Sequence, residues 1–423
     1  MNNLLSTQNL VESPFIVIDI GGVTFGSYNK KAMSNGNLNV TYPNYMKSIK
    51  INKVNGSVNT YTIVMEYAVT QKDDPNRLDK IFSRISNDRT VILKYGDWNS
   101  PSFIYKEEKA IVTGLNTSVD MNASKLTYTI TCTSDALYLS ASNNSFPAIT
   151  KKPSDEIKRI LKSDLSKIRT NIFHGMTEKN IANFNLIYSN DKSVRIEAKK
   201  NISTIDYINY LVSCMTPDTN HNKDGKKTDS TSTFIMRIYD DVNNELGGTY
   251  FKVSEIKSRM SIDEESDVFS VDVGYPTNNF VTAFNIVNND SWAILYDYSK
   301  EVNQSDNTYE IDKNGNVVSE NALSPLTISS NLQESTQSNR NWWSKVTAFP
   351  ITATLTIKGL IRPAILMSKV YINCYFYGHR HLSSGLYHIT KQEDVIDSRG
   401  YRTTLTLLRA GEDVVKYVSD EVV

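Results

Sequence analysis

Apolar and polar residues alternate along several segments of the N-terminal third, which is the period-two pattern of strands with one buried face. The clearest case is segment 126–133, where every second residue is a threonine. Its apolar positions are Leu126, Tyr128, Ile130 and Cys132. A similar alternation runs through 61–69, and an apolar run at 15–20 ends at a Gly-Gly pair. Antiparallel sheets with one packed and one polar face have this pattern. We therefore predict a strand-rich barrel or sandwich over residues 14–148, preceded by a tail over residues 1–13.

One helix is expected between these strands. Asp74 is suited to cap it, and Pro75 fits the first helical position. The apolar residues that follow have helical spacing. They are Leu78, Ile81, Phe82 and Ile85. The N-terminal domain is therefore predicted to hold several strands and one amphipathic helix over 74–86.

The middle section changes from period-two alternation to helical spacing. One helix is predicted to open at Pro153, with Ser154 as a cap. A second helix is predicted from Ser203, where Asp206 three residues later gives a variant of the capping box. Short strands are expected at 185–187, 193–198 and 234–239. We predict a small α+β domain over residues 149–245.

Period-two alternation returns in the C-terminal section. Three threonines separate the apolar residues Ile351, Ala353, Leu355 and Ile357, and Lys358 continues the alternation. Further strands are predicted at 251–253, 268–273, 281–287, 293–298, 370–377, 385–391 and 402–409. An Asn/Ser-rich stretch over 303–341 is interpreted as an insertion with a hairpin signal at 313–316. We predict a second strand-rich domain over 246–410, followed by a tail or short helix over 411–423.

The amino-acid composition supports the prediction of a β-rich fold and disfavours some classes of function. The 423 residues include 24 Tyr against 4 Trp, and Tyr favours strands. The 46 basic and 46 acidic residues balance to zero, which disfavours a nucleic-acid binder of the basic-patch type. The chain has no run of about 18 apolar residues, so no membrane-spanning helix is predicted. The N-terminus lacks the pattern of a secretory signal.

Three cysteines lie far apart in the sequence. Cys132, Cys214 and Cys374 match neither a zinc spacing nor a small disulfide framework. We interpret them as free thiols buried as small hydrophobic residues, which fits synthesis in a reducing cytoplasm.

Three histidines near the C-terminus are a candidate metal site. His379 and His381 would share one face of a strand, and His388 would follow on the neighbouring strand. Glu393 and Asp394 are close enough in sequence to contribute ligands. No third ligand is set by local spacing, so structural or surface histidines are the favoured interpretation.

Two loops resemble ion-binding or phosphate-binding motifs only in part. Oxygen-bearing residues alternate at Asp218, Asn220, Asn222 and Asp224, as in part of a calcium loop. The twelfth position counted from Asn220 is Thr231 rather than the expected bidentate acid, so a solvated loop is favoured. The glycines at 21, 22 and 26 lack the spacing and the lysine of a phosphate-binding loop, so a turn is predicted there.

Acidic pairs are the remaining candidates for catalysis. Glu107-Glu108 and Glu264-Glu265 could perform acid/base chemistry, but solvated loop charges are the favoured interpretation. The chain contains no Gly-x-Ser-x-Gly elbow and no nucleophilic Cys/His pattern. We therefore predict a protein that is not an enzyme and that needs neither cofactor nor metal.

Residues 349–409 carry a more specific pattern. A strand of alternating small and apolar residues reaches a glycine, and a proline-containing turn follows. A Ser-Gly-x-Tyr hairpin then leads to a last strand that alternates Thr and Leu and ends at an arginine. The marker residues are Gly359, Pro363, Ser384, Gly385, Tyr387, Gly400, Thr403 and Arg409. This pattern resembles the closing part of phage baseplate hub proteins and of their relatives in type VI secretion spikes.

The resemblance implies a β-rich α+β fold with two tail-tube-like β-barrel domains and a small α+β domain between them. It also implies a structural role in the tail baseplate of a bacteriophage virion, after synthesis in the host cytoplasm. Three chains would form a pseudo-sixfold ring that joins the sixfold tail tube to the threefold central spike and lets genomic DNA pass during ejection. The implied partners are two further copies of the chain, the tail tube or distal tail protein, the central spike, baseplate wedge proteins and the tape measure protein.

Two other functions stay open. Abundant tyrosine in a β-rich chain permits a tail-associated receptor-binding or carbohydrate-binding module. A cell-wall hydrolase would need paired carboxylates such as Glu107 and Glu108. The sequence also leaves open which side of the polar strands faces a lumen. Threonines that could line it are Thr127, Thr129, Thr131 and Thr133.

Overall fold

The computed structural model describes the strands, helices and adjoining turns of the chain. The described residues are 2–3, 14–27, 46–68, 89–97, 105–134, 137–141, 143–168, 191, 193–215, 232–239, 250–257, 269–274, 281–288, 310–311, 317–319, 351–359, 369–377, 379–381 and 383–409. All structural statements below concern these residues. None of their helices is both long and apolar enough to cross a bilayer.

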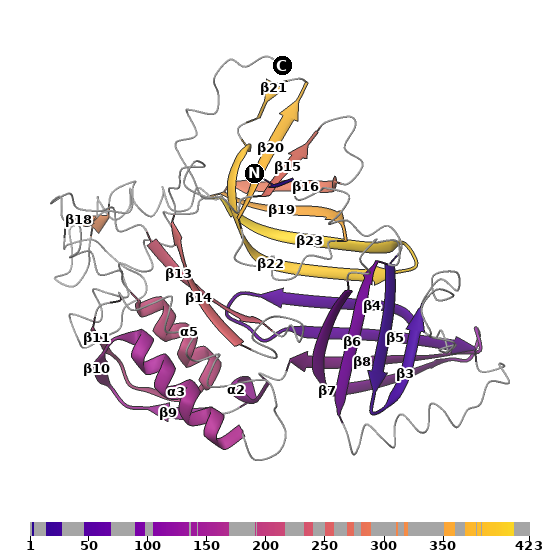
Figure 1. Ribbon diagram of the computed structural model, residues 1–423, viewed down its shortest axis with the longest axis horizontal. Coiled ribbons are helices and arrows are strands. Elements are labelled where there is room, and N and C mark those ends of the chain that lie inside the picture. Colours follow the sequence, from indigo (N-terminus) through magenta and orange to yellow (C-terminus); the bar gives the residue numbers. More distant parts are fainter. Residues whose placement is uncertain are drawn as a thin grey trace.

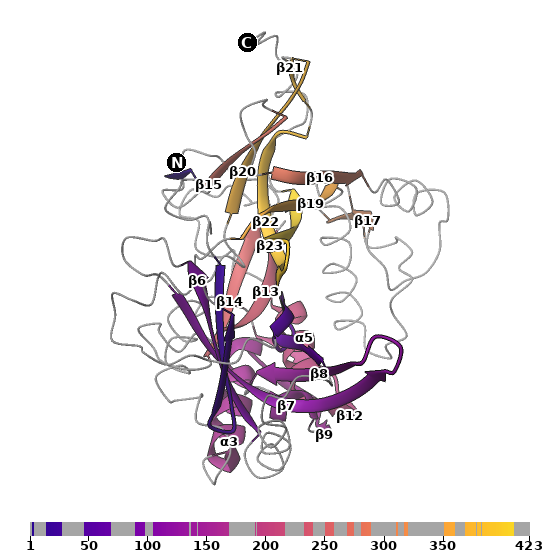
Figure 2. The same cartoon turned by 90° about the vertical axis from the view of Figure 1, so that its right-hand side faces the viewer.

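A single fifteen-stranded sheet contains strands from both strand-rich sections of the sequence (Figure 1). Its N-terminal strands are β2 (Pro14–Ile20), β3 (Val23–Ser27), β4 (Met46–Val54), β5 (Thr60–Ala68), β6 (Thr90–Asp97), β7 (Tyr105–Asp120) and β8 (Lys125–Ser134). Its other strands are β1 (Asn2–Asn3), β15 (Phe269–Val273), β16 (Val281–Asn288), β19 (Ile351–Lys358), β20 (Lys369–Phe376), β21 (His379–Arg380), β22 (Gly385–Asp397) and β23 (Gly400–Arg409). Figure 2 shows the β7–β8 hairpin extending away from the other strands.

Strand β22 joins the two sections. One of its edges pairs with β23 along most of its length. The other edge pairs with β20 over its first residues and with β4 over Lys391–Asp397. The pairing register shifts between Ile389 and Lys391, which marks a β-bulge at Thr390. Strand β22 is therefore longer than the strand predicted at 385–391. The prediction stopped early because the extra residue at the bulge interrupts the alternation of apolar and polar residues.

The described strands form an open, branched sheet. No ring of paired strands closes among them, so the expected pair of closed barrels is not found in this part of the chain. The β-rich character and the antiparallel pairing of most strands agree with the prediction.

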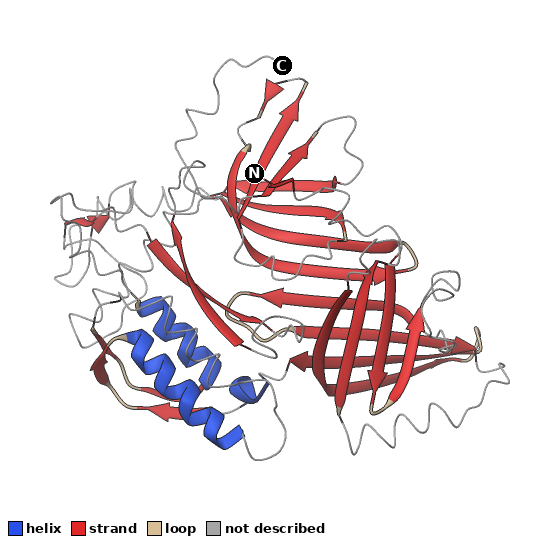
Figure 3. Cartoon of the chain, viewed as in Figure 1, coloured by secondary structure: helices blue, strands red, loops and turns tan. Residues whose placement is uncertain are grey.

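The middle section contains helices and two-stranded antiparallel sheets (Figure 3). The helices are α2 (Leu137–Ala141), α3 (Pro153–Ile168) and α5 (Thr204–Cys214). The short strands pair as β9 (Asn143–Phe146) with β12 (Lys199–Ser203), and as β10 (Ile149–Lys151) with β11 (Val194–Ile196). Two further antiparallel pairs are β13 (Ser232–Tyr239) with β14 (Tyr250–Lys257), and β17 (Glu310–Ile311) with β18 (Val317–Ser319). The last pair flanks the predicted hairpin signal at 313–316.

The two helix starts differ in how well the sequence predicted them. The Ser203 hydroxyl accepts a hydrogen bond from the backbone N–H of Asp206 at 3.1 Å, as the capping pattern predicted. Ser154, in contrast, lies inside α3 and does not cap it. Its backbone N–H and hydroxyl donate to the Asp191 carboxylate at 2.9 and 2.5 Å. A carboxylate from a distant segment therefore satisfies donors at this helix start.

Three hydrophobic clusters form beneath these elements. One lies under the N-terminal strands and also receives Ile396 and Tyr401 from the β22–β23 hairpin. A second lies under β15, β16, β19, β20, β22 and β23, and a third packs around α2, α3 and α5. The three cysteines are buried and form no disulfide.

Several predictions concern residues outside the described part. They are the helix at 74–86, the strands at 185–187 and 293–298, most of the stretch 303–341, the loop at 218–225, the pair Glu264-Glu265, Pro363 and the tail at 411–423. The turn predicted at the glycine pair is confirmed: Gly21 and Gly22 have φ values of 55° and 77° and connect β2 to β3. This left-handed backbone explains the two glycines.

Candidate functional site

Eight consecutive strands present one continuous polar surface. Their order is β16, β19, β23, β22, β4, β5, β8 and β7, and every neighbouring pair is antiparallel. We call the surface opposite the first two hydrophobic clusters the polar face. Its uncharged polar members are Ser48, Asn52, Thr60, Thr62, Asn116, Ser118, Thr127, Thr129, Thr131, Thr133, Asn285, Thr352, Thr354, Thr356, Thr404 and Thr406. The face therefore extends without a break from the C-terminal section into the N-terminal section.

Threonine predominates on this face because β8 and β19 carry threonine at successive alternate positions, and β5 and β23 add two threonines each. The registers align them across strands: Thr356 lies opposite Thr404, and Thr60 lies opposite Thr133. The hydroxyls of Thr356 and Thr404 are 3.2 Å apart. Such cross-strand pairs stabilise the sheet while leaving its outer surface polar.

Each of three carboxylates on this face is shared by two basic side chains. Glu66 on β5 contacts the Nζ atoms of Lys47 and Lys125 at 2.5 and 2.7 Å. Glu393 on β22 contacts Lys50 and Lys391 at 3.0 and 3.5 Å. Hydrogen bonds from Lys125 and Lys47 lower the pKa of Glu66.

The third shared carboxylate lies at the β22–β23 turn. Asp397 accepts hydrogen bonds from the guanidinium groups of Arg402 and Arg399 at 2.8 and 3.2 Å. Burial would raise the pKa of Asp397, but these bonds and one from the Arg399 backbone outweigh it and lower the pKa. Two cations for each of these carboxylates give this part of the face a local basic excess that the zero net charge of the chain does not reveal. The cations are partly engaged by carboxylates, so strong phosphate binding is not favoured.

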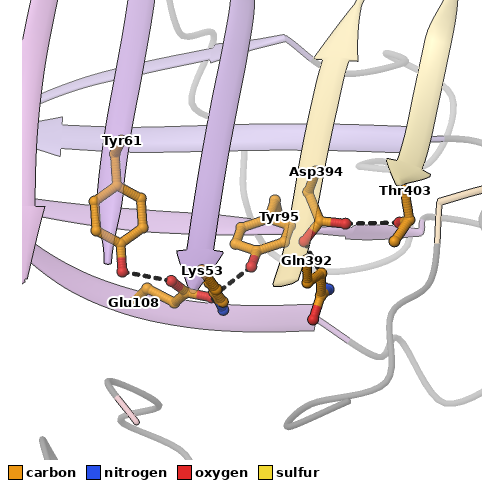
Figure 4. Close-up of polar contacts among 7 residues, drawn as sticks. All are labelled: Lys53, Tyr61, Tyr95, Glu108, Gln392, Asp394 and Thr403. Atoms are coloured by element: carbon orange, nitrogen blue, oxygen red, sulfur yellow. Dashed lines mark hydrogen bonds and ion pairs between the residues drawn. The ribbon is translucent and has the colours of Figure 1, made fainter. Parts of the chain in front are cut away.

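Beneath the junction of the two sections lies a buried ionic cluster (Figure 4). Glu108 on β7 is 2% exposed and forms an ion pair with Lys53 on β4. The hydroxyls of Tyr61 and Tyr95 donate to the same carboxylate at 2.7 and 2.5 Å. Burial would raise the pKa of Glu108, but the charge of Lys53 and the hydrogen bonds from Lys53 and both tyrosines outweigh it and hold the pKa below its usual value.

Residues of the C-terminal hairpin complete this cluster. The buried carboxylate of Asp394 accepts hydrogen bonds from Thr403 at 2.6 Å and Gln392 at 2.9 Å. The rings of Tyr401 and Tyr95 meet edge to face with centroids 6.2 Å apart. Burial, followed by the nearby carboxylates, raises the pKa of both phenols well above the usual value. These contacts attach the C-terminal hairpin to the N-terminal core.

The position of Glu108 corrects a prediction. The pair Glu107-Glu108 was interpreted as solvated loop charge, but both residues lie in strand β7 and Glu108 is buried. The reason is that alternation along β7 directs Glu108 inward, where Lys53 from another strand compensates its charge. An ion-paired carboxylate that is shielded from solvent is poorly placed to act on a cell-wall polymer.

Four residues of the C-terminal pattern lie together at the start of β22. The Ser384 hydroxyl donates to the Cys374 carbonyl at 3.0 Å and accepts from the Cys374 N–H at 2.9 Å. Arg409 donates to the Ser384 carbonyl at 3.0 Å. Gly385 leaves room for Arg409, because a Cβ atom there would lie 3.2 Å from its Nε. The Tyr387 hydroxyl donates to the Ser383 carbonyl at 2.6 Å. These contacts hold backbone and strand ends together, which is a structural role.

The other described residues of the pattern lie at the junction. A Cβ atom added to Gly359 would come within 2.1 Å of the Tyr401 ring, and the Gly359 N–H donates to the Tyr401 carbonyl at 2.8 Å. Gly400 has a φ of 104° in the β22–β23 turn, and Thr403 binds Asp394. The structure thus divides the pattern into two groups, one at each end of the β22–β23 hairpin.

The candidate metal-binding histidines are placed differently from one another. His379 and His381 are exposed, whereas His388 is 2% exposed. The His381 Nδ1 atom lies 2.7 Å from the Ser383 hydroxyl. Within the described ranges, no three His, Cys, Asp or Glu side chains are grouped so that they could hold a metal ion.

The middle section contains an open groove of about 720 Å³ between α3 and the β9–β10 segment. Its buried carboxylate, Glu156, accepts hydrogen bonds from Arg159 Nε at 3.0 and 2.9 Å. Lys151 approaches the same carboxylate at 3.7 Å. The acid is therefore compensated within the protein.

Comparison with known proteins rests on structure alone, since neither a family model nor a curated protein sequence matches the chain. The 43 kDa tail protein of prophage MuSo2 from Shewanella oneidensis aligns with a TM-score of 0.51 and 10% identity, over 94% of this chain and 97% of that chain. The tail protein from Neisseria meningitidis MC58 aligns with a TM-score of 0.48 and 8% identity, over 97% and 99% of the two chains.

A type VI secretion component from E. coli, c3393, aligns with a TM-score of 0.45 and 8% identity, over 88% of this chain and 76% of that chain. Its description notes structural similarity to bacteriophage T4 tail proteins. The first alignment shows that this chain shares the fold of a phage tail protein along nearly its whole length. The resemblance predicted from residues 349–409 is thereby confirmed at the level of the fold.

Proposed function

We propose that the chain is a structural hub protein of a bacteriophage tail baseplate. The observation that carries this proposal is the fold shared with a prophage tail protein over 94% of the chain. The polar face supplies the physical rationale, because both strand-rich sections contribute to one threonine-rich surface. The rest of the proposal follows from the expected assembly: three chains form a pseudo-sixfold ring between the sixfold tail tube and the threefold spike.

In this proposal the polar face lines the ring and genomic DNA passes along it during ejection. Hydroxyl groups and cations already shared with carboxylates would contact phosphates weakly, which permits sliding. In this proposal the tube-like domains span residues 14–148 and 246–410, with the α+β domain over 149–245 between them. The remaining partners would be the tube or distal tail protein, the spike, wedge proteins and the tape measure protein, all within the virion.

The mass of the purified chain in solution tests the proposal. A hub of this kind gives a species of three chains at micromolar concentration, which native mass spectrometry or analytical ultracentrifugation resolves. A chain that stays monomeric at that concentration, alone and with isolated tails, contradicts the proposed ring. Catalytic activity has no part in the proposal, because Glu108 is buried and paired with Lys53.

A further inference from the structure

The eight-strand arc that carries the polar face ends in two strand edges. Beyond Val112, no described strand pairs with the edge of β7 that faces away from β8. At the other end of the arc, no described strand pairs with the edge of β16 that faces away from β19. Unpaired backbone along a strand edge is a template for another strand.

The directions of these two strands suit pairing between copies. All seven strand pairings in the arc are antiparallel, so direction alternates from β7 to β16. Because the number of strands is even, β7 and β16 run in opposite directions. Rotation about a ring axis preserves each strand's direction along that axis. The β16 edge of one copy would therefore meet the β7 edge of the next copy as an antiparallel neighbour.

Apolar side chains are exposed at both ends of the arc. Leu115 and Val119 on β7 are 41% and 54% exposed, although they lie opposite Ile130 and Leu126 on the side of the hydrophobic core. On β16, Phe284 and Ile286 lie on the core side and are only partly buried. If the two edges pair so that the core-side residues of both strands lie on the same side of the sheet, these apolar residues become neighbours. It would also continue the polar face from Asn116 to Asn285.

We infer that the distal half of β7 pairs antiparallel with β16 of a second copy of this chain. The contact is heterologous, because two different edges meet, and such contacts generate closed rings when the rotation closes. This inference rests on the proposed ring and specifies which strands close it. Figure 2 shows that the β7–β8 hairpin, which carries this edge, extends away from the other strands.

Cysteine cross-linking tests the pairing directly. Asn116→Cys is combined in turn with Ala283→Cys, Asn285→Cys or Val287→Cys, all of which are positions on the polar face of the two edge strands. Opposed residues in an antiparallel pair approach closely enough for a disulfide. At least one combination is expected to give covalently linked chains on a non-reducing gel after mild oxidation, and each single variant is expected to give none.

The outcomes separate this inference from the proposed function. A three-chain species with no cross-link in any combination overturns the β7–β16 pairing but leaves the ring in place. Cross-links formed by Asn116→Cys alone or Asn285→Cys alone would show like edges meeting, which also overturns it. A chain that never assembles overturns the inference and the ring together.

A matched pair of substitutions gives a second, independent readout. Leu115→Asp introduces a charge at the proposed contact and is expected to weaken assembly about tenfold or more. Met121→Asp changes the same hairpin at its turn, outside the proposed pairing, where Met121 is 83% exposed. It should leave assembly unchanged. Equal effects of the two substitutions, with folding confirmed by circular dichroism, contradict the inference.

Discussion

The two hydrophobic cores beneath the polar face are built on different principles. The C-terminal core consists of aliphatic residues together with Cys374, Tyr387 and Phe284, and its tyrosine donates to a backbone carbonyl. The N-terminal core encloses the ion pair of Lys53 and Glu108. The charged cluster lies where the β22–β23 hairpin of one section packs on the strands of the other. We interpret it as a polar attachment that orients the two halves, since an apolar contact alone permits more arrangements.

The largest expected effect comes from breaking the ion pair on one side only. Glu108→Gln keeps the shape of the side chain but leaves the Lys53 ammonium buried without an opposite charge. We expect a loss of about 3–5 kcal/mol in the free energy of unfolding, measured by urea denaturation.

The double variant Lys53→Met with Glu108→Leu is the control for this prediction. It removes both charges at similar volume and is expected to be close to neutral in stability. Equal destabilisation by the single and double variants would show that packing at these positions, rather than charge compensation, matters.

The C-terminal core should respond through cavity formation instead. Leu405 is fully buried there, and Leu405→Ala is expected to cost about 2–5 kcal/mol in the free energy of unfolding. Since the substitution neither exposes a charged group nor leaves one buried without its partner, this cost should be the same at acidic and neutral pH. A pronounced pH dependence of the Leu405→Ala effect would contradict the contrast between the two cores.

The close contact between Gly359 and Tyr401 gives a smaller effect. A methyl group at Gly359 would overlap the Tyr401 ring, so Gly359→Ala is expected to cost about 1–3 kcal/mol in the free energy of unfolding. Gly114→Ala is the matched control, because its Cβ would lie 3.7 Å from Thr131 in ordinary contact. Equal melting temperatures for the two variants would argue against tight packing at Gly359.

The smallest effect concerns pH. The pKa of Glu108 lies below the usual glutamate value of 4.5 in the folded protein, so its ionised form stabilises folding above that value. This contribution is lost as pH falls through the folded pKa. We expect the gap in unfolding free energy between wild type and Glu108→Gln to be complete at neutral pH and to narrow on acidification below about 4.5. A gap that widens on acidification would have the wrong sign.

The sequence predicted those features of the fold that depend on the residues of a single strand or helix. Alternation in 126–133 and 351–358 predicted β8 and β19, and the serine cap of α5 was confirmed. Strand β22 was underestimated because the bulge at Thr390 shifts the phase of its alternation. Strand β7 was missed because its first part, at 106–109, is a run of charged residues.

The buried cluster could not be predicted for a different reason. Glu108 and Lys53 are 55 residues apart, and Asp394 and Tyr401 come from the far end of the chain. The pairing of β4, β5, β8 and β7 brings Lys53 near Glu108, and the pairing of β22 with β4 adds the C-terminal residues. A signal was nevertheless present, since Gly359, Gly400 and Thr403 of the C-terminal pattern all lie near this junction.

The central claim is that both strand-rich sections build one polar face that lines a ring of chains. A cryo-electron microscopy reconstruction of the intact tail tests it most directly. We predict three copies around the tail axis, with the threonines of β5, β8, β19 and β23 facing the channel. A map in which this face points outward, or in which the chain occurs outside the axial ring, would contradict the account.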